Sequence, residues 1–277
     1  MATFHARDES FDFKIPESDD NWRHYRHGSP LSEHAAVFFS TVTEADPSTH
    51  PVSIGIDCEL TGPGHSGRVV SAALVGVNAD REIVIVACWN LEPTYPAHKK
   101  TIDNFWNRIV PVEMRVWLKG TRAIDRVRAI AEIGEVLSEI KSLNPHVKFI
   151  SDHLVTDETA FTALMTEIFG AAIHERTIDG NDDAFVTSDD VNMQMRIVAS
   201  LVAGKVVKDF REVYAVLATI GYKRVRSQEI APKLRAVIPD LPELLLNDHS
   251  AIFDAACSLW RWLSLQDLIG HVKVTAA

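Results

Sequence analysis

The chain has few cysteines and no long apolar run. Its 277 residues contain three cysteines, which are widely spaced in apolar surroundings: Cys58, Cys88 and Cys257. This usage argues against a disulfide framework or a cysteine-based zinc site. No apolar stretch reaches the roughly 18 residues that a membrane helix requires, and the first residues are polar, unlike a signal peptide. These absences predict a protein of the cytoplasm, or of another reducing intracellular compartment, with no membrane partner.

Positive charge is also scarce. Lys and Arg total 28 against 38 Asp and Glu, which gives a formal net charge of −10. A general nucleic-acid coating protein would usually be basic, so the balance argues against that class. It does not exclude an enzyme that holds one short strand end in a local groove. The length fits one large α/β domain, or one domain with an appendage.

A pair of carboxylates stands out in a segment that otherwise has the pattern of a buried strand. Alternate residues share one apolar face of that strand: Val52, Ile54, Ile56, Cys58 and Leu60. Asp57 and Glu59 lie on the other face, close to a turn predicted at residues 61–64. Like charges on one face repel, and a divalent cation would remove that repulsion. The pair therefore predicts a metal site at a strand terminus, although isolated Asp-x-Glu pairs also occur on solvated strand ends.

The remaining pattern predicts a main domain at residues 51–277 and an N-terminal extension at 1–50. In the extension, Ser29 and Pro30 predict the start of one helix, whose apolar stripe runs from Leu31 to Val42. The main domain begins with strands near 52–60, 68–77 and 82–89, predicted to form an antiparallel meander. A helix over 124–140, a strand at 147–150, a helix over 156–169 and an acidic loop at 177–190 follow, and then helices near 191–202, 210–219 and 251–268. This order is typical of a mixed sheet flanked by helices.

Other residues could complete a site with the acidic pair. Asp157 falls where a strand gives way to a helix, so it is either a helix cap or a ligand. His249 directly precedes the last predicted helix and Asp254 lies one turn inside it, although a histidine in that position can also be a loop residue without a role. A cationic cluster is either a solvated face or a phosphate contact: Lys205, Lys208, Arg211 and residues 222–226.

Taken together, these motifs resemble those of the DEDDh 3′–5′ exonucleases, a superfamily with the ribonuclease H-like fold that includes oligoribonuclease, ribonuclease T and polymerase proofreading domains. GIDCELTG is similar to the first motif, ISDHLVTDETAF to the second and DHSAIFDAA to the third, over roughly residues 52–268. The second motif has Ser151 and Asp152 where the family has His-Asn, which leaves Asp152 as an alternative to Asp157. Residues 101–106 are similar to a segment of phage-type exonucleases.

The resemblance implies a five-stranded ribonuclease H-like mixed sheet flanked by helices. It also implies two Mg²⁺ or Mn²⁺ ions, bound by four carboxylates: Asp57, Glu59, Asp157 and Asp254. His249 would be the general base, and Leu60 and Thr61 would line the terminal nucleotide. The expected substrate is the 3′ end of single-stranded RNA or DNA, with RNA favoured, and the expected products are nucleoside 5′-monophosphates.

Other functions are compatible with the same residues. One is a DNA proofreading or repair exonuclease that works within an assembly, and another is a catalytically silent domain that binds nucleic acid or a partner protein. All five residues of the motif set can be placed in this sequence, which favours an active enzyme. The sequence does not choose between a monomer and a homo-oligomer.

Overall fold

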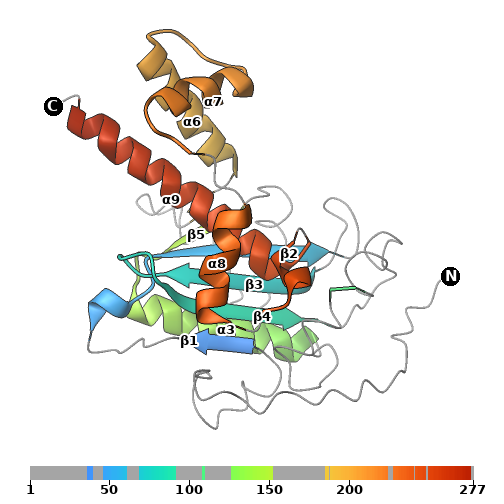
Figure 1. The fold of residues 1–277 in the computed structure, drawn as a ribbon. Helices are drawn as coiled ribbons and strands as arrows, with labels where there is room; N and C mark the ends of the chain where they lie inside the picture. Colours follow the sequence, from blue (N-terminus) through green and yellow to red (C-terminus); the bar gives the residue numbers. More distant parts are fainter. Residues whose placement is uncertain are drawn as a thin grey trace.

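A computed structural model describes residues 36–39, 46–60, 69–91, 108–109, 126–151, 185–186, 188–223, 227–239, 241–247 and 249–275. These residues form a mixed α/β structure in which a twisted sheet lies between helix α3 (Arg126–Leu143) on one face and helices α8 (Ser227–Val237) and α9 (Ala251–Thr275) on the other (Figure 1). The mixed sheet flanked by helices that the sequence predicts is therefore present.

The described sheet has six strands in the order β1-β4-β3-β2-β5-β6. Their bounds are β1 Ala36–Phe39, β2 Ser53–Leu60, β3 Val69–Val77, β4 Ile83–Asn90, β5 Lys148–Ser151 and β6 Phe185–Val186. Strands β2, β3 and β4 pair antiparallel, which confirms the predicted meander. Strands β5 and β6 continue the sheet on the other side of β2 in parallel, and α3 lies on the crossover from β4 to β5. A parallel return requires such a long connection, because a tight turn can join only antiparallel neighbours.

The predicted N-terminal helix is wrong over residues 36–39. These residues form β1, which pairs antiparallel with β4, so that Phe38 lies opposite Val86. Val37, Phe38 and Phe39 are β-branched or aromatic residues, which favour a strand once a neighbouring strand offers free backbone groups. The sheet consequently has one strand more than the expected five. The other residues of that predicted helix lie outside the described part of the chain.

The helices otherwise follow the predicted pattern, with two differences. Helices α3, α6 (Ser188–Ala203), α7 (Phe210–Thr219) and α9 fall where apolar periodicity indicated them. Helix α8 was not predicted, because it is rich in polar residues and carries Pro232 inside it. The expectation of an acidic loop over residues 177–190 is wrong at the C-terminal end of that range, because β6 and the first turn of α6 lie there. The helix expected over 156–169 lies outside the described residues.

Short 3-10 helices complete the described elements, at Pro47–Thr49 before β2 and at Glu243–Leu246 before α9. Among the residues that the structure describes, no helix is long and apolar enough to cross a membrane.

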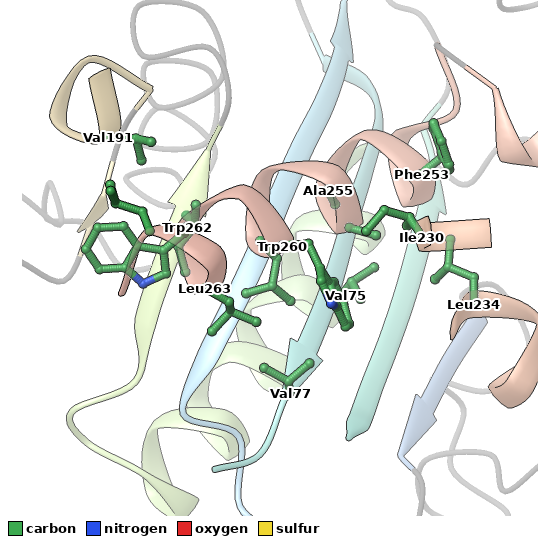
Figure 2. Packing of buried hydrophobic residues seen from close by; sticks show 14 of the residues in the cluster. Val75, Val77, Val191, Ile230, Leu234, Phe253, Ala255, Trp260, Trp262 and Leu263 are labelled. Carbon is green, nitrogen blue, oxygen red and sulfur yellow. The ribbon is translucent and has the colours of Figure 1, made fainter. Parts of the chain in front are cut away.

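Strand β2 is covered on both faces. Ile54 and Ile56 pack in an apolar cluster with Ile133 and Leu137 of α3. The opposite face lies under α9, whose Trp260 covers Val75 of β3, while Phe253 packs beside α8 (Figure 2). The face that carries Asp57 is therefore not a solvated surface, and α9 lies directly on it.

Candidate metal centre

The structure brings together three carboxylates that are far apart in the sequence. One carboxylate oxygen each from Asp57, Glu59 and Asp254 lie within 4.8 Å of one another. Asp57 is 8% exposed, and the other two residues are partly buried. In the described part of the chain, these three side chains form the group that could hold a metal ion.

Strand β2 positions two of the three acids. Asp57 and Glu59 occupy alternate positions near its C-terminal end, so their side chains lie on the same face of the sheet. In the register with β3 they lie opposite Ala73 and Ser71, both small residues that leave room above the strand. The register shifts between Glu59 and Leu60. Such an irregularity bends a strand, and here it does so directly after the acidic pair.

Helix α9 supplies the third acid from its first turn. A carboxylate in that position is stabilised by the partial positive charge of the helix N-terminus. The helix reaches β2 because residue 55 is a glycine: a Cβ there would lie 2.0 Å from the carbonyl oxygen of Ala255 and 2.9 Å from the Cβ of Leu259. Gly55 therefore allows the contact that places Asp254 beside Asp57.

His249 lies at the entrance to the same cluster. Its backbone N–H donates a hydrogen bond of 2.9 Å to Oδ2 of Asp254. Its φ of 71° lies in the left-handed region, which is uncommon for residues other than glycine and is found at functional sites. The following residue, Ser250, donates its N–H to the carbonyl oxygen of Asn247 at 3.2 Å. These contacts hold an exposed histidine next to the acids.

Other predicted site residues are not brought into the cluster by the described part of the chain. Leu60 is the last residue of β2. Thr61, Asp157 and its alternative Asp152 lie outside the described residues.

The cationic cluster lies elsewhere, around α6 and α7. Gln266 of α9 approaches Gln194 of α6 at 3.5 Å. At 1.5 Å per residue, about 18 Å of α9 separate Gln266 from Asp254. Lys205 forms an ion pair of 2.7 Å with Glu212 of α7. The described cations of this cluster therefore do not border the acids.

Asn90 is a polar residue on the acidic face that the sequence did not indicate. The register places Glu59, Ser71 and Asn90 side by side on β2, β3 and β4, which puts their side chains on one face. Asn90 is fully buried, and neither its Nδ2 nor its Oδ1 has a hydrogen-bond partner among the described residues. A buried amide without partners is costly, and here it lies beside the acidic cluster, so Asn90 is a further candidate residue of the site. In the sequence, Asn90 is visible only as the polar residue that ends the apolar run of residues 83–89. The strand register is what places it in line with Glu59.

No protein-family model matches the chain, and no curated protein sequence matches it either. The geometry of the acids and the likeness of their motifs are thus the grounds for assigning a function.

The donor set suits a hard divalent cation. Mg²⁺ and Mn²⁺ prefer carboxylate oxygens, and three of these converge here from two elements. Three negative charges this close repel one another, and Asp57 is also largely removed from water. A bound cation relieves both penalties, so the residues present fit a metal ion.

Proposed function

We propose that the protein is a metal-dependent 3′–5′ exonuclease of the DEDDh type, acting on single-stranded nucleic acid, with RNA favoured over DNA. The observation that carries the proposal is the convergence of Asp254 on Asp57 and Glu59, with ligand oxygens within 4.8 Å. The motif resemblance requires these three acids to meet in space.

The arrangement of the sheet supports the same proposal. The five strands other than β1, in the order β4-β3-β2-β5-β6, combine an antiparallel meander with two parallel strands. Helices cover both faces (Figure 1). We propose that these strands are the ribonuclease H-like core and that β1 is an addition at its edge. The acids then lie at the C-terminal end of the central strand, where ligands reach a strand terminus.

The proposed reaction is hydrolysis of the last phosphodiester of a strand. Bound Mg²⁺ or Mn²⁺ neutralises charge on the phosphate and makes a water more acidic. Asp57, Glu59 and Asp254 would hold the metal, and Asp157 would complete the ligand set. The reaction releases a nucleoside 5′-monophosphate and leaves a new 3′ hydroxyl on the shortened strand.

His249 is the proposed general base, and it accepts a proton from the attacking water through a ring nitrogen. Imidazole suits this role because its ordinary pKa lies near neutrality. The hydrogen bond from the backbone of His249 to Asp254 keeps the base and the metal ligands in one unit. Leu60 and Thr61, directly after the acids, are proposed to contact the terminal nucleotide.

Purified protein incubated with 5′-labelled oligonucleotides tests the proposal. With Mn²⁺ or Mg²⁺ we expect a ladder that shortens from the 3′ end, and with EDTA no product. An oligonucleotide with a 3′-terminal phosphate serves as the matched control, because it should be degraded more slowly than its 3′-hydroxyl counterpart. Absence of cleavage of both RNA and DNA with either metal would contradict the proposal and favour a silent binding domain. Faster cleavage of DNA than of RNA would instead favour a proofreading or repair enzyme.

A further inference from the structure

Helix α6 is apolar on two faces. One face packs into the core through Val191, Met195 and Val198. On another face, Met193, Ile197 and Leu201 are 54%, 51% and 70% exposed. These three recur every four residues and form one continuous stripe. A helix that is apolar on two faces is expected to be covered on both, and within the described residues only one is covered.

Within the described residues, every large apolar side chain that is exposed lies on α6 or directly after it. Besides the three residues of the stripe they are Val202, at the end of α6, and Val206, three residues beyond the helix. Helices α6 and α7 lie beyond the sheet, beside the C-terminal half of α9 (Figure 1). Monomeric proteins rarely expose a contiguous apolar patch of this kind. The stripe is therefore a candidate interface.

We propose that α6 packs antiparallel against α6 of a second copy of this chain, which makes the protein a homodimer. The stripe is close to symmetric about Ile197, so a two-fold axis there would pair Met193 of one copy with Leu201 of the other. An interface formed by the same patch on both copies must be self-complementary in this way. Ser200 and Gly204, one turn apart beside the stripe, add little bulk, so the two helices can approach to the usual 8–10 Å between axes.

Charge at the ends of α6 favours a second copy over an unrelated partner. Asp190 lies in the first turn of the helix, whereas Lys205 and Lys208 follow its end. An antiparallel pair places the acidic end of each copy beside the basic end of the other, twice per dimer. Lys205 already contacts Glu212 within its own chain. Lys208 adds positive charge at the same end. Such an arrangement fixes orientation and register.

This proposal stands apart from the proposed nuclease activity. The stripe and the acids lie on different elements, and about 18 Å of α9 separate Asp254 from the residue that contacts α6. A protein without nuclease activity could therefore be a dimer, and an active nuclease could be a monomer.

Sedimentation velocity of the full chain tests the interface. The wild-type protein is expected to sediment as a species of twice 30.8 kDa at concentrations of about 1–100 μM. Ile197→Glu should raise the dissociation constant at least about 30-fold, since it buries two like charges at the centre of the interface. Ala215→Glu is the matched control, since it adds the same charge at an exposed position of α7 and should leave the dimer intact. Circular dichroism should show the helical content of wild type for both variants.

A charge exchange tests the antiparallel orientation. Asp190→Lys and Lys205→Glu should each raise the dissociation constant several-fold, and the double variant should recover most of the loss. A wild-type protein that sediments as a monomer at about 100 μM would overturn the proposal. It would also be overturned by a dimer that survives Ile197→Glu, or by a double variant that is weaker than both single variants, since these results would place the contact elsewhere.

Discussion

The two faces of the sheet differ at one end. Toward α3, the buried side chains are apolar along β2, β3 and β4, with Ile54, Leu74 and Ile85 at the centre. Toward α9, the same strands are apolar over most of their length, but they end in Asp57, Glu59, Ser71 and Asn90. A polar patch under a helix costs folding free energy. Among the described strand residues this polar patch is confined to one end of the α9 face, which supports the proposed metal centre there.

Each face also contains a glycine at which an added Cβ would be crowded, by α9 at Gly55 and by the neighbouring strands at Gly76. At Gly55, an added Cβ would lie 2.0 Å from the backbone of α9, which cannot shift without moving the whole helix. At Gly76, an added Cβ would meet side chains of the α3 face, Ile85 at 3.2 Å and Ile54 at 3.3 Å. The contact at Gly55 is the tighter one, and the proposed metal centre depends on it.

The largest expected effect comes from Asp57→Asn, which removes a charge from the acidic end of the α9 face. We expect metal-dependent cleavage to fall below detection, since the variant loses a ligand. The fold should persist, because the substitution also relieves repulsion with Glu59 and Asp254. Thermal unfolding with and without Mn²⁺ provides a readout that does not depend on activity. At 100 times its dissociation constant, Mn²⁺ should stabilise wild type by about 2.7 kcal/mol and the variant by much less.

The variant His249→Asn tests whether His249 acts as the proposed general base or as a metal ligand. Asparagine adopts the left-handed conformation of residue 249 more readily than most residues, so the backbone contact with Asp254 should persist. We expect the cleavage rate to fall by roughly 10²–10⁴-fold, with Mn²⁺ affinity unchanged by calorimetry. Loss of Mn²⁺ binding in this variant would show instead that His249 acts as a ligand.

Gly55→Ala tests whether the close approach of α9 builds the site. Overpacking against backbone should destabilise the protein by about 3 kcal/mol. The displaced helix should also carry Asp254 away from the other acids, so cleavage and Mn²⁺ affinity should both fall in protein that is still folded. Gly76→Ala is the matched control on the α3 face, with about 1 kcal/mol of destabilisation expected and no change in Mn²⁺ affinity. Equal effects of the two variants on Mn²⁺ binding would contradict the difference between the faces.

The smallest effect is expected from Ile133→Val, which removes one methylene from the α3 face. Ile133 is fully buried, so the loss of contacts should cost about 1 kcal/mol in the free energy of unfolding. Cleavage per folded molecule should be unchanged, because this face holds none of the acids. Chemical denaturation and a nuclease assay on the same preparation measure both quantities. A fall in activity beyond the loss of folded protein would show that the two faces are coupled.

Apolar periodicity was sufficient to predict most of the described elements. The meander β2–β3–β4 and helices α3 and α9 were expected because a long segment whose apolar residues keep one spacing fits either a strand or a helix, but not both. The pattern failed at β1, where residues 36–39 suit a strand or a helix and pairing with β4 selects the strand. It also failed at α8, whose buried apolar residues, Ile230 and Leu234, show no clear periodicity until they are seen packed in the core.

The candidate site was predicted in part. Asp57, Glu59, Asp254 and His249 were all identified from their motifs, and the described residues place them near one another. Asn90 was missed, because its position on the acidic face follows from two successive strand registers and not from any local pattern. The role of Gly55 was missed for the same reason, since the atom that it admits belongs to a residue far along the chain.

The sequence by itself determined the local choices: which segments alternate as strands, which follow helical periodicity, and which strand carries two acids on one face. These choices depend on neighbours within a few residues, so a linear pattern contains them. Only the tertiary structure decided that Asp254 meets Asp57, that Asn90 lies in line with Glu59, and that α6 keeps an apolar stripe in solvent. Each of these depends on the packing of elements that are distant in the chain, and packing is set by shape and register, which no local pattern records.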